Sequence, residues 1–268
     1  MFAPKILLHP EENYFPMNPV DFIYISRFRQ HVGFGRDYGY NKVSAKWVKT
    51  DEKSPEYYNI PVEIINSFGL NDDEKRTNRR PRDKNRGRAG NVFLQPDGKP
   101  QGISNSTGRV PCFYIQIEAD NNYIFHQYWL FFGYNPSLVG IDLSHQGDWE
   151  DYTAVTKDNK LVGAILNAHG KRTCYKREEL EFDRGQVQIY CALGTHALYP
   201  REGWFGKFKT DKTKPGGYAW DTSQNIALLS EQPWRDYAGA WGEVGELPAT
   251  TGPLGAWYKV IEQDFLNR

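Results

Sequence analysis

The stretch of residues 123–135, YIFHQYWLFFGYN, decides the fold class of this chain. It follows the strand-like alternation of residues 110–118, VPCFYIQIE, after the short segment ADNN. Alternation with a period of two predicts a strand, and a short polar segment between two such runs predicts a hairpin turn. The second run is so rich in aromatic side chains that we expect other parts of the protein to cover both of its faces.

More strands are expected on either side of this hairpin. Residues 148–156 (DWEDYTAVT) and 160–169 (KLVGAILNAH) form a second predicted hairpin around the polar turn 157–160. Residues 186–194 (QVQIYCALG) predict a further strand, and residues 5–9 (KILLH) a first short one. Successive strands with short polar turns and few helical periods are typical of an antiparallel sandwich.

One helix start interrupts the strand pattern. Asn18 can cap, Pro19 suits the first helical position, and Asp21 adds an acid to the first turn. The helix is expected to run through residues 20–31. The fold class predicted is therefore mainly β, an antiparallel β-sandwich with one or two short helices and long loops, in a single domain of residues 1–268.

Composition supports a β-rich protein and limits its partners. Aromatic residues make up 15 % of the 268 residues, Met occurs twice, and the mean hydropathy is −0.69. The formal net charge is zero, but residues 75–88 hold eight basic residues and one acid, which leaves −7 on the rest. We expect residues 71–91 to form a mobile basic loop. Without aromatic side chains for base stacking, this loop does not favour a nucleic-acid partner.

The cysteines and the N-terminus bear on the compartment. Cys112, Cys174 and Cys191 are an odd set without a C-x-x-C pair, which argues against a disulfide framework and a cysteine-rich zinc site. Residues 1–15 lack the features of a signal peptide, and no run of 18 apolar residues predicts a transmembrane segment. We expect a soluble chain, cytoplasmic or secreted after loss of a leader, and leave the compartment open.

The stretch HQGDWE, residues 145–150, is the main candidate for function. In a strand Asp148 and Glu150 point to one face and Trp149 to the other, so the stretch has a polar side and a packing side. His145 lies just before the strand and could fold over the acids. The bland alternative is an acidic turn beside a buried ring, with an acid that only accepts backbone hydrogen bonds.

Hairpin register adds a distant residue to this candidate site. A turn centred on Asp158 and Asn159 pairs residues whose numbers sum to 317, which places Asp148 opposite His169. Directly opposed side chains lie roughly 5 Å apart at Cβ and share a face. A loop of odd length would shift the register by one residue and separate the pair.

Two kinds of chemistry suit these residues. His145, Asp148, Glu150 and His169 are candidate ligands of a divalent metal ion, with Mg²⁺, Ca²⁺ or Mn²⁺ favoured by the acids and Zn²⁺ possible if histidines dominate. General acid/base catalysis is the alternative, with Glu150, His169 and His196 as candidate catalytic residues. His196 lies beyond a strand, after Gly194, where a side chain can project onto a rim; a histidine bonded to its own loop is the bland reading.

These motifs resemble a known family. HQGDWE, the preceding YWLFFGYN, and the later AHG and GTHALYP are similar to the family of vacuolar protein sorting-associated protein 62. The segments FAPKILLHPEENYFP, DKTKPGGYAWDT (211–222) and WRDYAGAWGEVG extend the resemblance over most of the chain, apart from roughly residues 33–105. The family's name reflects a sorting phenotype. His169 and His196 match its pattern, and Trp220 and Asp221, in its Gly-Gly loop, are candidate substrate contacts.

A more distant resemblance concerns the H-x-x-D-W-E spacing. It is similar to the G-H-R-H-D-W-E heptad of necrosis- and ethylene-inducing peptide-like proteins, which are secreted β-sandwich cytolysins. The resemblance implies that His145, Asp148 and Glu150 match heptad side chains of a divalent-metal site used for docking on sphingolipid head groups. Gly147 stands where the heptad has its second histidine, so one possible ligand is missing.

Three functional hypotheses follow. The first is a divalent-metal-binding β-sandwich that recognises a glycan or lipid head group, as a toxin-like or membrane-acting effector with peripheral membrane contact. The second is a metal-dependent hydrolase of phosphodiester or glycosidic bonds, with Glu150 or a histidine as general base. The third is a sorting or scaffold protein. No G-x-S-x-G, Walker or dinucleotide-binding motif occurs, which argues against serine-nucleophile, nucleotide-driven and NAD chemistry.

Overall fold

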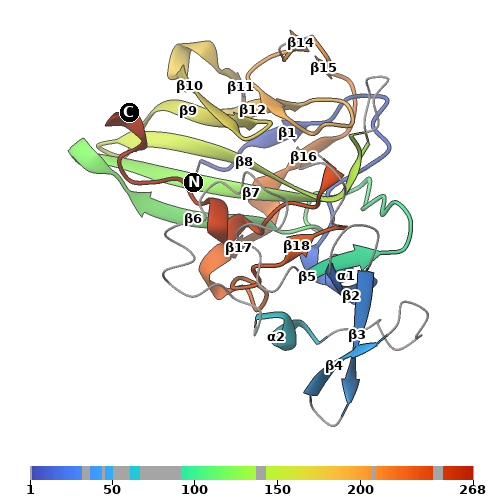
Figure 1. Ribbon diagram of the computed structural model, residues 1–268. Helices are drawn as coiled ribbons and strands as arrows, with labels where there is room; N and C mark the ends of the chain where they lie inside the picture. Colours follow the sequence, from blue (N-terminus) through green and yellow to red (C-terminus); the bar gives the residue numbers. More distant parts are fainter. Residues whose placement is uncertain are drawn as a thin grey trace.

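The computed structural model describes residues 2–31, 37–43, 46–50, 61–66, 92–136, 143–206, 209–243 and 250–267. The protein is mainly β, as expected, and three layers succeed one another in Figure 1. The basic segment 71–91 lies outside the described residues.

The central layer is a six-stranded sheet, here called the central sheet. Its order is β10-β9-β8-β7-β6-β17. The strands are β6 (Cys112–Glu118), β7 (Tyr123–Asn135), β8 (His145–Lys157), β9 (Lys160–Ala168), β10 (Lys171–Lys176) and β17 (Ile226–Leu228). The predicted hairpin of residues 110–118 and 123–135 is β6–β7, and the predicted second hairpin is β8–β9. Both faces of β7 are buried along most of its length, as its aromatic sequence predicts.

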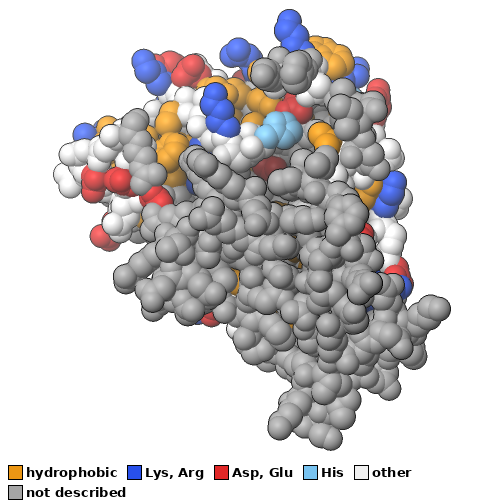
Figure 2. All heavy atoms as spheres, viewed as in Figure 1, with side chains coloured by type: hydrophobic (Ala, Val, Ile, Leu, Met, Phe, Trp, Pro, Cys, Tyr) orange, Lys and Arg blue, Asp and Glu red, His pale blue; other side chains and the backbone are white. Residues whose placement is uncertain are grey.

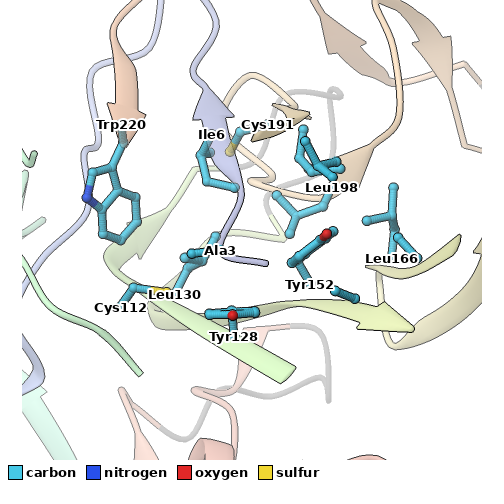
Figure 3. Packing of buried hydrophobic residues seen from close by; sticks show 14 of the residues in the cluster. Ala3, Ile6, Cys112, Tyr128, Leu130, Tyr152, Leu166, Cys191, Leu198 and Trp220 are labelled. Carbon is cyan, nitrogen blue, oxygen red and sulfur yellow. The ribbon is translucent and has the colours of Figure 1, made fainter. Parts of the chain in front are cut away.

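A second sheet covers one face of the central sheet. Its order is β11-β12-β1-β16, with β13 also paired to β12. The strands are β1 (Lys5–Leu7), β11 (Glu181–Asp183), β12 (Gln186–Cys191), β13 (Leu198–Tyr199) and β16 (Ala219–Asp221). Figure 3 shows the shared core between these two sheets, with Tyr128, Leu130 and Tyr152 on one side and Ile6, Leu198 and Trp220 on the other. This is the expected sandwich, although β1–β12, β6–β17 and β5–β18 pair in parallel.

The third layer covers the other face of the central sheet. It contains α1 (Pro19–Tyr24), α2 (Val62–Ile65) and a sheet of order β18-β5-β2-β3-β4, and its core joins Trp149 to Phe131, Trp234 and Trp241. The strands of that sheet are β2 (Ser26–His31), β3 (Asp37–Val43), β4 (Lys46–Thr50), β5 (Val92–Pro96) and β18 (Ala240–Trp241). The remaining elements are the pair β14 (Gly203–Phe205) and β15 (Asp211–Thr213), and short 3-10 helices at Asp120–Asn122, Arg177–Glu179, Thr222–Gln224, Leu229–Glu231, Ala256–Lys259 and Phe265–Asn267.

The predicted helix begins where expected and ends early. The Asn18 side chain accepts a hydrogen bond from the Val20 amide, and Pro19 opens α1. The helix ends at Tyr24, because the chain from Ser26 onward pairs with β5. The prediction of a helix to residue 31 is therefore wrong: strand pairing, a tertiary interaction, overrides the local helical pattern.

The β8–β9 hairpin keeps its predicted register only near the turn. Thr156 faces Leu161 as expected, but Val155 faces Gly163, so Val162 is an extra residue in β9. This β-bulge shifts the rest of the hairpin by one position. Gly163 belongs to the same irregularity, because a Cβ there would lie 2.3 Å from the Tyr175 carbonyl oxygen of β10. The prediction that Asp148 lies directly opposite His169 is wrong for this reason.

Candidate functional site

The acids of HQGDWE lie at the start of β8 on the face that packs against the second sheet. Asp148 and Glu150 share this face and are both buried, whereas Trp149 packs into the aromatic core on the other side. His145 is turned back, with its Nδ1 2.8 Å from the Gly147 carbonyl oxygen. Gly147 has a φ of +66°, and a Cβ would lie 2.0 Å from the Trp241 carbonyl oxygen. A histidine at this position, as in the heptad, would collide with that backbone.

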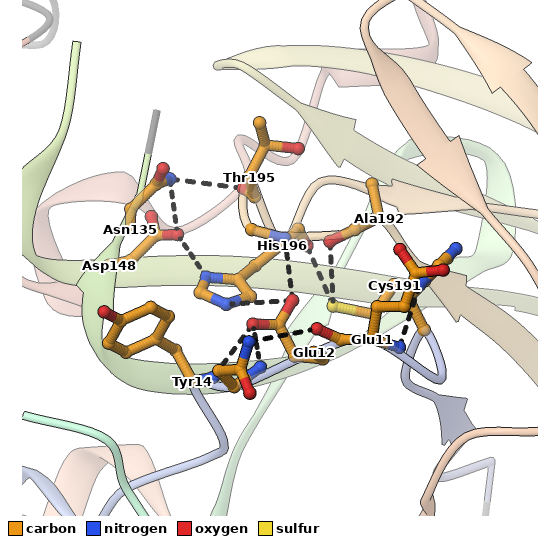
Figure 4. Close-up of polar contacts among 12 residues, drawn as sticks. Glu11, Glu12, Tyr14, Asn135, Asp148, Cys191, Ala192, Thr195 and His196 are labelled. Atoms are coloured by element: carbon orange, nitrogen blue, oxygen red, sulfur yellow. Dashed lines mark hydrogen bonds and ion pairs between the residues drawn. The ribbon is translucent and has the colours of Figure 1, made fainter. Parts of the chain in front are cut away.

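A buried imidazole joins Asp148 to the N-terminal segment. His196 Nδ1 lies 3.0 Å from Asp148 Oδ2, and its Nε2 forms an ion pair with Glu12 Oε2 at 3.8 Å. Figure 4 shows the His196 ring between the two carboxylates. The opposite side of the ring is closed by Phe132, stacked at 3.9 Å between centroids. His196 is therefore held by charge on its edges and by an aromatic ring on its face.

Glu12 was not predicted as a site residue. Its carboxylate accepts backbone N–H groups from Asn13, Tyr14 and, 182 positions along the chain, Gly194. No local pattern marks this acid. The signal that could have found it is its place in FAPKILLHPEENYFP, one of the segments that carry the family resemblance.

The pKa values define the charge on this triad. Burial alone would lower the pKa of His196, but the hydrogen bond to Asp148 and the interactions with Glu12 outweigh it and raise the pKa to about 9. Burial would raise the pKa of both acids, yet the hydrogen bonds from His196 and other donors lower the pKa of Asp148 and of Glu12. At neutral pH the triad is an imidazolium between two carboxylates, with a net charge of −1.

Glu150 differs from its neighbour. It is 7 % exposed, and its Oε2 has no hydrogen-bond partner among the described residues. Burial, followed by repulsion from Asp148, raises the pKa of Glu150 well above its usual range. A buried polar atom without a partner costs free energy, so it is a feature that calls for an explanation.

His169 does not meet Asp148 directly but binds another acid. Its Nε2 lies 2.6 Å from Oδ2 of Asp211 on β15, which is fully buried, while the imidazole side chain is 54 % exposed. Thr195 and Tyr199 also donate their hydroxyl groups to Asp211. The hydrogen bond to Asp211 is the main cause that raises the pKa of His169. Asp211 was not predicted either; the segment 211–222 carried the only signal.

Hydrogen bonds connect the two histidine–acid pairs. Asn135 Nδ2 donates to Asp148 Oδ2 at 2.9 Å and is 3.2 Å from the Thr195 carbonyl oxygen. The Thr195 hydroxyl in turn binds Asp211, the partner of His169. His169 and His196, both predicted from the sequence, therefore belong to one polar site, although they bind different acids.

The four predicted metal ligands do not converge in this arrangement. Across the described ranges, no group of three His, Cys, Asp or Glu side chains is placed to hold a metal ion. His145 and His169 are directed to other partners, so a zinc shell rich in imidazoles does not fit. A hard cation such as Mg²⁺ needs only one or two carboxylates, because water and ligand oxygens complete its shell. The partner-free oxygen of Glu150, two residues from Asp148, fits a cation of that kind.

The two predicted substrate contacts lie in other surroundings. Trp220 is fully buried in the core opposite Ile6 and has no surface to offer a ligand. Asp221 caps the 3-10 helix that follows it and accepts a hydrogen bond from Gln186 at 2.8 Å. Both side chains therefore stabilise the second sheet and its connections in this structure.

Comparison with known proteins was made by sequence and by structure. No family model matches the chain. The chain is similar to vacuolar protein sorting-associated protein 62 of Saccharomyces cerevisiae. It is 23 % identical to that sorting protein over 283 residues, which cover 90 % of this chain and 58 % of the yeast protein. The chain thus spans little more than half the length of its yeast relative.

Solved structures give the second comparison. One is NLPPya in complex with mannosamine, at 12 % identity and a TM-score of 0.42, covering 92 % of this chain and 79 % of that one. Another is Necrosis and Ethylene inducing Protein 2 from the causal agent of cocoa's Witches Broom disease, at 15 % identity and a TM-score of 0.33, covering 85 % and 82 %. Both relationships that the motifs indicate therefore have a counterpart among known proteins.

The described residues also bear on membrane contact. No helix formed by them has the length and apolar character needed to cross a bilayer. The three cysteines are free thiols, of which Cys112 and Cys191 are buried and Cys174 is exposed.

Proposed function

We propose that this protein recognises a glycan or a lipid head group through a divalent cation held by Asp148 and Glu150 at the start of β8. The observation that carries the proposal is the buried Oε2 of Glu150, which has no hydrogen-bond partner in the described part of the chain. Glu150 lies two residues from Asp148 on the same face, roughly 6.6 Å along the strand. Two carboxylates at this spacing, one of them unsatisfied, suit an oxygen-seeking cation.

The surrounding residues would orient these ligands. His196 and Asn135 both bind Oδ2 of Asp148, which fixes the plane of its carboxylate. Glu12 holds His196 from the other side. Outer partners of this kind position metal ligands and tune their charge. The cation would supply open coordination positions for hydroxyl or other oxygen atoms of the ligand.

Direct titration with metal tests the proposal. We expect Mg²⁺, Ca²⁺ or Mn²⁺ to bind the purified protein in calorimetry and to raise its melting temperature, and a chelator to reverse both effects. Glu150→Gln and Asp148→Asn should abolish the metal-dependent shift. Glu118→Gln on the exposed part of β6 and Asp158→Asn in the β8–β9 turn are matched controls and should retain it.

Ligand screening completes this test. A glycan array and vesicle sedimentation, each with and without chelator, should show binding that requires the cation. Unchanged melting in chelator, together with no metal by elemental analysis, would overturn the proposal.

A second candidate function is hydrolysis of a phosphodiester or glycosidic bond. The observation that favours it is the half-exposed His169 held by the buried Asp211, an arrangement that orients an imidazole as a general base. Turnover on a panel of phosphodiesters and glycosides, lost in His169→Asn and in Glu150→Gln but kept in Glu118→Gln, would support it. An absence of turnover would leave recognition as the function.

A role in sorting or as a scaffold is the third candidate. It draws on the name of the yeast relative, of which the chain spans 58 %. Affinity capture of one protein partner, equally strong with and without chelator and unaffected by Glu150→Gln, would favour it over the recognition of a head group.

A further inference from the structure

The imidazole of His169 is the exposed end of a rigid polar assembly. It occupies the two-residue turn between β9 and β10, with Gly170 as the second turn residue. Asp211 holds its Nε2 from the protein side, and Asp211 is itself fixed by hydroxyl groups of Thr195 and Tyr199. The acid is fully buried, whereas 54 % of the His169 side chain is exposed. Such a preorganised donor pays little entropy when it binds a ligand.

The free edge of this imidazole can donate a hydrogen bond. Nε2 carries the proton shared with Asp211, and within the described ranges no residue contacts Nδ1. The hydrogen bond to Asp211 raises the pKa of His169, which favours the doubly protonated form with Nδ1–H directed outward. Asp211, Tyr199 and, farther away, Asp148 are the titratable groups that face this ring.

Charge balance limits what can bind beside it. Glu12, Asp148 and protonated His196 together carry −1, and His169 with Asp211 is neutral. An anion would therefore be repelled by the bare site. A divalent cation at Asp148 and Glu150 reverses the sign of the local charge or cancels it, whether Glu150 is protonated or ionised. Lys and Arg side chains also surround the end of the molecule that carries β10, β14 and β15 (Figure 2).

We propose that the ligand of this site carries a phosphate ester, whose oxygens face both the cation at Asp148 and Glu150 and the outward edge of His169. This inference rests on the proposed function, because it needs the cation. A phosphate has several equivalent oxygens and can satisfy two separated positive groups at once, and Mg²⁺ is commonly shared between carboxylates and a phosphate. A phosphorylated sugar or inositol and the head group of a phospholipid share this chemistry.

A matched pair of probes tests the inference. Calorimetry with myo-inositol 1-phosphate and with myo-inositol, each in saturating Mg²⁺ and in chelator, isolates the contribution of the phosphate. We expect the phosphate ester to bind at least tenfold more tightly than the polyol, and only with Mg²⁺. His169→Asn should weaken this binding by about tenfold to a hundredfold, as expected for a charge-assisted hydrogen bond, and leave the affinity for Mg²⁺ unchanged.

The chain provides a control with the same backbone. Arg184 occupies the corresponding position in the β11–β12 turn, before Gly185, with a φ of 52° against 53° for His169. Asn tolerates this left-handed conformation. Arg184→Asn therefore removes one positive charge from an equivalent turn and should leave binding unchanged. His169→Gln serves as a second variant if His169→Asn does not fold.

The outcomes separate this inference from the proposed function. Mg²⁺ binding without preference for the phosphate ester, or equal loss of affinity in His169→Asn and Arg184→Asn, would overturn the inference and leave the proposed function intact. No Mg²⁺ binding would overturn both. Sedimentation with phosphatidylinositol vesicles, compared with phosphatidylcholine alone, distinguishes the sources: capture lost in His169→Asn identifies a lipid head group, and binding only of the soluble ester identifies a free phosphate ester.

Discussion

The two faces of β8 carry buried acids one residue apart, and the fold treats them differently. Asp151 faces the third layer and accepts hydrogen bonds from Gln127, Asn167 and Arg172, so both of its oxygens have partners. Glu150 faces the second sheet, and its Oε2 has none among the described residues. Burial is nearly the same for both. The difference therefore lies in what the surrounding sequence supplies, and it marks one acid as structural and the other as open to a ligand.

The satisfied face has a clear structural task. Arg172 binds Asp151 and also donates to the Lys259 carbonyl oxygen, and Gln127 accepts the Ile261 amide. The network around Asp151 thus fastens the C-terminal segment to the central sheet. Hydrogen bonds that satisfy every partner in a buried network stabilise one arrangement of the chain.

Breaking this network is expected to have the largest effect. Asp151→Ala removes the acceptor of three side chains and leaves Arg172, only 19 % exposed, without its ion pair. We expect a loss of about 3 kcal/mol in the free energy of unfolding, measured by urea denaturation. Glu118→Ala on exposed β6 is the control. A loss below about 1 kcal/mol would mean that the satisfied face of β8 does not stabilise the fold in this way.

Asp148→Asn is the next largest and tests the boundary between the two kinds of acid. It weakens the hold on buried His196, and we expect a loss of about 2 kcal/mol at pH 7. Because the pKa of His196 is raised to about 9, this ion pair contributes fully below pH 6.5, and its contribution is lost as pH rises through 9. Urea denaturation at pH 6, 8 and 9.5 should show the cost shrinking. A cost independent of pH would contradict a charged His196.

Glu150→Gln should change stability in the opposite direction. The folded protein raises the pKa of Glu150, so above about pH 4.5 the unfolded chain loses a proton that the folded chain keeps, and this favours unfolding. Gln resembles the protonated acid and cannot ionise. We expect a gain on the order of 1 kcal/mol at pH 8 and little change at pH 4. A loss of stability at pH 8 would show that Glu150 has a partner in the folded protein.

The contrast between these faces was only partly predictable from the sequence. Alternation in HQGDWE and the aromatic run of β7 correctly predict the two-sided β8 and its buried neighbour. The position of His169 relative to Asp148 was not predictable, because one extra residue, Val162, shifts the hairpin, and its place depends on contact with β10. Glu12 and Asp211 meet the site from distant segments, and local periodicity carries no information about such contacts.

His169→Asn is expected to have the smallest effect on stability and bears on the open face alone. Because the side chain is more than half exposed, solvent screens its ion pair with Asp211, and we expect a loss below about 1 kcal/mol. The raised pKa of His169 means that its contribution is present below pH 6.5 and fades as pH rises through the higher folded value. Denaturation at pH 5.5 and 8.5, with Arg184→Asn as control, should show a small cost only at the lower pH. A large cost at both would make His169 part of the structural framework, like Asp151, and remove it from the open face.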